Sequence, residues 1–203
     1  MVQVTTLFWD VGGVLLTNGW DRVSRAQAVE RFNLDGQDFE ARHKLMDAEL
    51  ETGDLTLDEY LRQTVFYRAR PFTQAEFKAF MLAQSHPYPE ALAVLDRVAS
   101  SGNYLLATLN NESLELNLYR IDRFDLRRYF TVFLSSCYLG VRKPDEAIYR
   151  KALWITQRPP EESVLIDDRE ANLEPAERCG MRTIRYQTPP QAQHDLERLG
   201  VQF

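Results

Sequence analysis

The stretch Thr5-Thr6-Leu7-Phe8-Trp9-Asp10-Val11-Gly12-Gly13-Val14-Leu15 decides the fold that this sequence predicts. Its apolar run has the composition of a short strand that is buried on both faces of a parallel sheet. The run ends at Asp10, and the glycines that follow permit a sharp turn and the close approach of a ligand. Because ligands bind at the carboxyl ends of parallel strands, Asp10 is the first candidate for chemistry. An ordinary strand-to-turn signal would explain the same residues, since Asp and Gly are common in turns.

Composition narrows the class of protein. The chain has 203 residues, a net charge of −6 and a hydrophobic fraction of 44%. Its length and hydrophobic fraction are enough for one sizeable core that needs no metal ion or disulfide bond for stability. The acidic balance argues against nucleic acid and anionic membranes as partners. Cys137 and Cys179 form no CxxC pair, and neither a signal-peptide pattern nor a membrane-length apolar run is present. We therefore expect a soluble cytoplasmic protein with no nucleic-acid and no membrane partner.

A helical pattern follows the first strand. Apolar residues recur at helical spacing, and Thr56 with Glu59 and Thr73 with Glu76 indicate capping boxes at helix starts. The expected helices span residues 20–32, 39–50 and 57–67, and a further helix begins after Thr73. These helices are more than a single crossover connection between two strands needs. The segment therefore predicts an inserted helical bundle.

From Pro89 onward, helical and strand-like segments alternate, as expected for right-handed parallel crossovers. The expected strands lie at residues 104–109, 131–134, 164–166 and 182–185, and the expected helices at residues 90–100, 112–123, 145–155, 170–179 and 191–199. The predicted fold class is α/β, with a doubly wound (Rossmann-like) parallel sheet core and an inserted α-helical bundle cap. The predicted core domain comprises residues 1–17 and 87–203, and the predicted helical cap domain comprises residues 18–86.

Polar side chains follow three of the predicted strands. They are Asp10, the pair Asn110-Asn111 and the pair Asp167-Asp168. The carboxyl ends of parallel strands meet at one edge of a sheet, so we expect these side chains to converge. Carboxylates there would bind Mg²⁺, which prefers hard oxygen ligands, and Lys143 would act as a point charge on a phosphate. Each signal alone has an ordinary explanation, because an Asp pair before a helix is often only a cap.

Four motifs follow one another along the chain: Asp10-Val-Gly-Gly-Val after the first strand, Asn110 after the second, Gly140-Val-Arg-Lys-Pro-Asp145, and Ile166-Asp-Asp-Arg-Glu-Ala-Asn172. In this order, they resemble the motifs of the haloacid dehalogenase (HAD) superfamily. The resemblance covers essentially the whole chain, and the helical insertion is similar to the C1-type cap of that superfamily. The Asp-x-Gly-x-Val start and the segment 53–59 resemble more closely the α-D-glucose-1-phosphate phosphatase-like group.

The resemblance implies a nucleophile and a metal site. Asp10 is the expected nucleophile, which forms an aspartyl-phosphate that water then hydrolyses. Asp10, the backbone carbonyl of Gly12 and Asp168 are the expected Mg²⁺ ligands. Asp167 belongs to the same metal site, where it is expected to orient Asp168 or a bound water.

The resemblance also implies contacts with the substrate, and the chain departs from the family pattern at two of them. Lys143 would neutralise the phosphoryl oxygens, and Asn110 and the loop at Gly12 would help to hold the phosphate. Most phosphatases of the superfamily carry a second aspartate, a general acid and base worth about 10²–10⁴-fold, where this chain has Gly12. The glucose-1-phosphatase-like group also lacks it. A Ser or Thr usually precedes the asparagine, where this chain has Leu109.

Other polar residues have ordinary structural explanations. His43 or Asp21 could replace the missing acid and base, and Trp20 could stack on a sugar, but such residues more often have structural roles. The arginines from Arg120 to Arg128 alternate with aspartates and predict a solvated face.

The predicted function is therefore Mg²⁺-dependent hydrolysis of a small phosphomonoester, such as a sugar phosphate, by a monomer or homodimer. One alternative is a catalytically weakened relative that binds a phosphorylated ligand or a protein partner, to which Gly12 and Leu109 point. Another is a metal-independent dehalogenase, in which Asp10 would attack carbon. The Asp167-Asp168 pair disfavours that alternative, because a dehalogenase has no use for a metal site.

Overall fold

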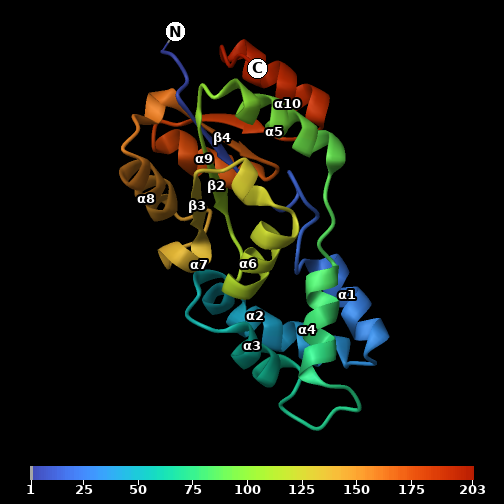
Figure 1. Ribbon diagram of the computed structural model, residues 1–203. Coiled ribbons are helices and arrows are strands. Elements are labelled where there is room, and N and C mark those ends of the chain that lie inside the picture. The colour runs from blue at the N-terminus through green and yellow to red at the C-terminus, as the bar shows by residue number, and fades with distance from the viewer. Residues whose placement is uncertain (1) are drawn as a thin grey trace.

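The computed structural model describes residues 2–203, and a parallel five-stranded sheet lies among helices in the upper part of Figure 1. The strands are β1 (Thr6–Trp9), β2 (Leu105–Asn110), β3 (Val132–Ser135), β4 (Ser163–Asp167) and β5 (Arg182–Arg185). They lie in the order β3-β2-β1-β4-β5, so that β1 pairs with both β2 and β4. The predicted doubly wound parallel sheet is confirmed.

Helices cover both faces of the sheet, which is why β1 is buried along its whole length and is apolar from Leu7 to Trp9. Leu7 and Trp9 pack on one side and Phe8 on the other, because successive side chains of a strand alternate. The first side carries α5 (Pro89–Ser101), α6 (Leu114–Arg123) and α10 (Pro189–Arg198), and the second carries α8 (Glu146–Thr156) and α9 (Glu170–Arg178). The short elements are the helix α7 (Ser136–Leu139) and the 3₁₀ turns Leu126–Arg128 and Pro160–Glu162.

A helical insert separates β1 from α5 and forms the lower part of Figure 1. Its helices are α1 (Arg22–Arg31), α2 (Gly36–Thr52), α3 (Leu57–Thr64) and α4 (Gln74–Ala83). Both predicted capping boxes are present. The N–H groups of Glu59 and Glu76 each donate to the threonine three residues earlier at 3.2 Å, which satisfies N–H groups that a helix start leaves unpaired.

The helical insert has an apolar core of its own. Phe39, Tyr60 and Phe77 are buried in it, separately from the two clusters that flank the sheet. A helical bundle inserted into an α/β fold is therefore present, as the sequence predicts. The division at residues 18 and 86 stays a prediction. None of the helices in residues 2–203 is long and apolar enough to cross a membrane.

The two segments that join the helical insert to the sheet run side by side. The Thr17 N–H donates to the carbonyl of His86 and its hydroxyl to the carbonyl of Gln84, both at 2.8 Å. Arg120 of α6 reaches both segments, because its Nε donates to Ser85 Oγ at 3.0 Å and its Nη2 donates to the carbonyl of Thr17. One arginine therefore ties both connections to a helix of the sheet layer.

Some helix boundaries differ from the prediction for local reasons. The helix predicted from residue 112 begins at Leu114, because the Glu112 N–H donates to Ser136 Oγ at 3.0 Å and stays outside the helix. The helix predicted from residue 20 begins at Arg22, after Asp21 accepts the Ser24 N–H at 2.9 Å as an N-cap. The four-residue helix α7 was not predicted, since so short a helix has no readable periodicity.

Candidate functional site

Three carboxylates meet at the carboxyl edge of the sheet. β1 pairs with β4 in a register that sets Trp9 beside Ile166, so the residues that follow, Asp10 and Asp167, are also neighbours. The Asp10 N–H donates to the carbonyl of Ile166 at 2.9 Å. One oxygen each from Asp10, Asp167 and Asp168 lies within 4.8 Å of the others. The predicted convergence of Asp10 with the Asp167-Asp168 pair is therefore present.

Lys143 lies against two of these carboxylates, although it follows a different part of the chain. Its Nζ is 3.1 Å from Asp10 Oδ2 and 2.5 Å from Asp167 Oδ2, and its side chain is 1% exposed. Asn111 fixes the backbone of Lys143 with a pair of hydrogen bonds. The Lys143 N–H donates to Asn111 Oδ1 at 2.8 Å, and Asn111 Nδ2 donates to the Lys143 carbonyl at 2.9 Å. Lys143 and Asp10, the candidate nucleophile, therefore form a buried ion pair.

The two aspartates that end β4 occupy different environments. Asp167 is fully buried, and its carboxylate accepts Asn172 Nδ2 at 3.0 and 3.1 Å and the Arg169 N–H at 2.9 Å. Asp168 is half-buried and lines a cavity. Gly13 is required beside it, because a Cβ there would lie 2.5 Å from Asp168 Oδ2 and the φ of Gly13 is +79°. Asp167 is thus held by its neighbours, while Asp168 lies at the cavity wall.

The cluster carries more negative charge than its single lysine balances. Burial raises the pKa of Asp10 to about 7, Lys143 opposes the rise, and Asp167 and Asp168 add to it. The pKa of Asp168 is also raised, by burial and by Asp167. Burial opposes ionisation of Lys143, but the adjacent Asp10 and Asp167 carboxylates hold its pKa above the ordinary value. A hard divalent cation fits this donor set, since carboxylate oxygens are the ligands that Mg²⁺ prefers.

The end of β2 is arranged differently from the expectation. Asn110 is 2% exposed and does not line the cavity. Its Oδ1 accepts Ser135 Oγ at 2.9 Å, and its Nδ2 donates to Asn117 Oδ1 at 3.3 Å. Asn111 lines the cavity instead. It is the second asparagine of the pair that the sequence places at the end of this strand. Leu109 is buried in the apolar cluster on the α8 side of the sheet.

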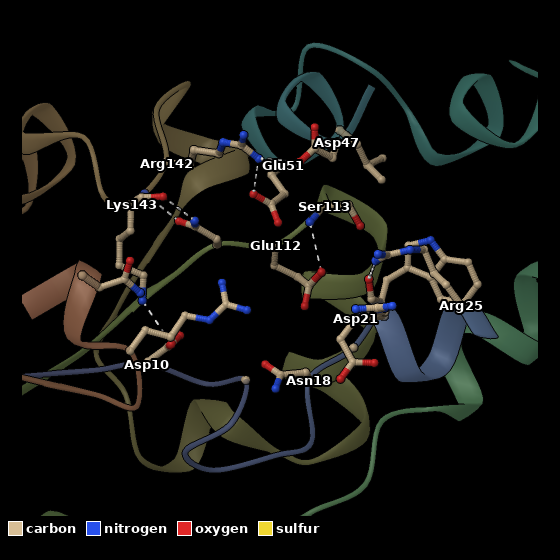
Figure 2. A pocket seen from close by; sticks show the side chains of 18 of the residues that line it. Asp10, Asn18, Asp21, Arg25, Asp47, Glu51, Glu112, Ser113, Arg142 and Lys143 are labelled. Carbon is tan, nitrogen blue, oxygen red and sulfur yellow. Dashed lines mark hydrogen bonds and ion pairs between the residues drawn. The ribbon is translucent and has the colours of Figure 1, made fainter. Parts of the chain in front are cut away.

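A cavity of about 520 Å³ opens between this edge of the sheet and the helical insert (Figure 2). Its far wall is one face of α2, where His43, Asp47, Leu50 and Glu51 follow one another at helical spacing. Arg142, next to Lys143 in sequence, forms ion pairs with this face of α2. Its Nη1 lies 2.8 Å from Glu51 Oε2 and 3.3 Å from Asp47 Oδ2. Cavities of this size accommodate small ligands.

A buried ion pair forms a further part of the cavity wall. Arg120 is 2% exposed and Glu112 8% exposed, and Arg120 Nη1 lies 2.9 Å from Glu112 Oε2. The prediction of a solvated arginine face is therefore wrong for Arg120, because the partners that bury it, Ser85 and Thr17, are distant in sequence. Burial raises the pKa of Glu112 to about 7 in spite of Arg120, and Glu51 adds to the rise.

The raised pKa of Glu112 predicts how Glu112→Gln changes the pH dependence of stability. Because the pKa of Glu112 in the folded state lies above its ordinary value, folding favours the protonated carboxyl. The contribution of Glu112 to stability is therefore fully present below about pH 4.5 and is lost as the pH rises through about 7. We expect Glu112→Gln to match wild type near pH 4.5 and to be more stable by roughly 3 kcal/mol above pH 7. Urea unfolding of both proteins between pH 4.5 and 8 measures the difference. A variant less stable than wild type at pH 8 would show that attraction to Arg120 outweighs the cost of burial.

The structure shows what surrounds Gly12, where the general acid and base is missing, and what surrounds His43 and Asp21, which could replace it. A Cβ on Gly12 would lie 3.0 Å from Asn18 Oδ1 and 3.6 Å from Arg120 Nη1, so an amide and a guanidinium lie where the absent side chain would project. Burial lowers the pKa of His43 to about 4, which leaves it neutral at pH 7. Trp20 packs edge-on against the aromatic core of the helical insert, and Asp21 is an N-cap.

Sequence comparisons find a matching family and similar proteins of known name. Residues 4–180 match the haloacid dehalogenase-like hydrolase family. The chain is 31% identical over 97 residues to the phosphoglycolate phosphatase of Aquifex aeolicus, an alignment that covers 48% of this chain and 45% of that protein. It therefore spans about half the length of that relative. It is 26% identical to the glyceraldehyde 3-phosphate phosphatase of Pyrococcus furiosus, over 97% of this chain and 86% of that one.

A solved structure shares the fold. A HAD family enzyme of Bacteroides thetaiotaomicron, in complex with magnesium and inorganic phosphate, superposes with a TM-score of 0.77 at 20% identity, over 91% of this chain and 94% of that one. The parallel sheet with its helical insert is thus a shared architecture. From the family match over residues 4–180 it follows that the chain belongs to the haloacid dehalogenase-like hydrolases.

Proposed function

We propose that the protein is a Mg²⁺-dependent phosphatase that hydrolyses a small phosphomonoester through an aspartyl-phosphate on Asp10. The observation that carries the proposal is the buried group of three carboxylates with Lys143 at the carboxyl edge of the sheet. Asp10, Asp168 and the backbone carbonyl of Gly12 would hold the metal ion. When bound, Mg²⁺ would offset the charge of the carboxylates and of the phosphoryl oxygens.

Asp10 and Lys143 would carry the two displacements. Asp10 Oδ attacks phosphorus, the bond from phosphorus to the ester oxygen breaks, and the departing ester oxygen takes up a proton from solvent to give the alcohol. Water then attacks the phosphorus of the aspartyl-phosphate and gives a proton to solvent, the bond to Asp10 breaks, and phosphate is released. Lys143 Nζ, beside Asp10 Oδ2, stabilises negative charge in both steps. Asp167 holds Lys143 and the loop that bears Asp168, and thus acts on the reaction through its neighbours.

Substrate size and class are proposals that rest on the cavity and on the relatives. Two relatives are named for small phosphorylated compounds, phosphoglycolate and glyceraldehyde 3-phosphate. The cavity of about 520 Å³ is walled by charged and polar side chains of both layers, which suits a polar leaving group such as a sugar. We also keep as proposals that Asn110 helps to hold the phosphate, that the protein acts in the cytoplasm, and that it is a monomer or homodimer.

Metal removal tests the proposal directly. Phosphate release from a panel of sugar phosphates and p-nitrophenyl phosphate should fall by about 10³-fold or more in EDTA, because the metal supplies several kcal/mol of transition-state stabilisation. Added Mg²⁺ should restore it. Halide release from a 2-haloacid that EDTA does not affect would instead identify a dehalogenase. Thermal stabilisation by phosphorylated compounds without turnover would identify a binding protein.

A further inference from the structure

A chain of two hydrogen bonds runs through the helical insert and ends at the cavity. Trp20 Nε1 donates to the hydroxyl of Tyr60 at 3.0 Å, and that hydroxyl lies 2.9 Å from Nδ1 of His43. Tyr60 is fully buried in the aromatic core of the helical insert. His43 and Trp20 both line the cavity that also contains Asp10. The imidazole is therefore fixed by groups that the reaction itself does not use.

The donors in this chain determine which nitrogen of His43 carries hydrogen. An indole N–H can only donate, so the Tyr60 oxygen accepts from Trp20. The Tyr60 hydroxyl has one hydrogen, and His43 Nδ1 is the acceptor that it meets among residues 2–203. The opposite arrangement would leave a buried O–H unpaired, which is unfavourable. Tyr60 therefore donates to Nδ1, and the hydrogen of neutral His43 is on Nε2.

Nε2 is the part of the ring that remains available. Among the described residues it has no hydrogen-bond partner, and it is not one of the buried polar atoms that lack one, so it is accessible to solvent on a residue that lines the cavity. The charged groups around the ring are Arg25 on α1 and Glu40 and Asp47 on α2. Arg25 is held by Glu40 at 2.8 Å and Asp47 by Arg142 at 3.3 Å. Burial and Arg25 keep the ring neutral at pH 7.

We propose that His43 is a fixed hydrogen-bond donor that selects, through Nε2–H, phosphomonoesters whose leaving group carries an acceptor oxygen, such as the hydroxyl of a sugar or polyol. The inference rests on the proposed phosphatase function and specifies the substrate class of that site. A neutral N–H donor offers nothing to an alkyl leaving group, and it cannot accept from an ammonium group. His43 is thus a specificity determinant for the leaving group and takes no part in proton transfer.

Nitrogen NMR of the histidine side chains tests the tautomer without any turnover. In wild type at pH 7 we expect the His43 hydrogen on Nε2, with no titration of His43 above pH 5. Tyr60→Phe removes the donor to Nδ1, so both tautomers should become populated. Hydrogen on Nδ1 in wild type would overturn the proposal, as would ordinary titration near pH 6.5.

Binding to an inactive variant tests recognition separately from catalysis. In Asp10→Asn with Mg²⁺, glycerol 1-phosphate should shift the His43 Nε2 resonance, whereas propyl phosphate and inorganic phosphate should shift it much less. Titration is continued until each compound saturates the variant, as judged by its thermal stabilisation. Equal shifts by bound glycerol 1-phosphate and bound propyl phosphate, or no shift by either when bound, would refute recognition by His43. Because this measurement needs no phosphate release, failure of the proposed phosphatase activity would be recognised independently.

Kinetics with matched substrates then measure the contribution of the donor. The ratio of kcat/KM for glycerol 1-phosphate to kcat/KM for propyl phosphate should fall about tenfold in His43→Leu, as expected for one lost hydrogen bond. His43→Gln keeps an N–H donor at a similar distance from the backbone and should restore part of the ratio. An unchanged ratio in His43→Leu would refute the assignment.

Discussion

Asp10→Asn should reduce phosphate release by at least about 10⁴-fold while the fold is retained. The amide cannot attack phosphorus to form the covalent intermediate, and it is a poorer metal ligand than a carboxylate. The side chain keeps its shape, so its hydrogen bond from the Val11 N–H at 2.8 Å can persist. Single-turnover phosphate release with the best substrate of the panel measures the loss.

Stability separates a lost nucleophile from a damaged fold. Burial and the neighbouring carboxylates raise the pKa of Asp10 to about 7, so ionised Asp10 is unfavourable in the folded state and its replacement by an amide should not destabilise the protein at pH 8. Lys143 keeps its contact with Asp167. Urea unfolding of Asp10→Asn should give a free energy of unfolding equal to or above that of wild type. Phosphate release that persists in a stable Asp10→Asn variant would exclude Asp10 as the nucleophile.

The sheet and the group of carboxylates at its carboxyl edge were predictable because their signals are local. A short apolar run followed at once by Asp10 and two glycines indicates a buried strand with polar chemistry at its end. The parallel arrangement then places Asp10 beside Asp167, although they are far apart in sequence. The capping boxes of α3 and α4 are equally local, since each is a threonine with a glutamate three residues later.

The walls of the cavity were not predictable, because their partners come from separate elements. Arg120 looks like a surface arginine until its bonds to Ser85 and to Thr17, 103 residues away, are seen. His43 meets Tyr60 on another helix, 17 residues away. Asn111, not Asn110, lines the cavity, and a shift of one residue at a strand end depends on how the loop turns. Pairings of this kind follow from how separate elements pack together in the fold, which the local residue pattern does not show.

Lys143→Met should have a large effect on both activity and stability. Its removal leaves Asp10 and Asp167 buried beside each other without a cation, and breaking a buried pair costs about 3–5 kcal/mol. Phosphate release should fall by about 10³-fold or more, because Lys143 stabilises charge in both displacements. Lys143→Arg is the matched control, since it keeps the positive charge but places a wider group in a site that is 1% exposed. It should be less destabilised than Lys143→Met.

The stability loss in Lys143→Met should depend on pH in a definite direction. Without the lysine, the pKa of Asp10 should rise further above its value of about 7, because the group that lowers it is gone. At pH 5 the carboxyl is then protonated in the folded variant, and less of the repulsion remains. The free energy of unfolding, measured with urea in EDTA, should therefore differ more between wild type and variant at pH 8 than at pH 5. Equal losses at both pH values would mean that Lys143 stabilises the fold by packing and not by its charge, and its proposed role on the phosphoryl oxygens would lose its electrostatic basis.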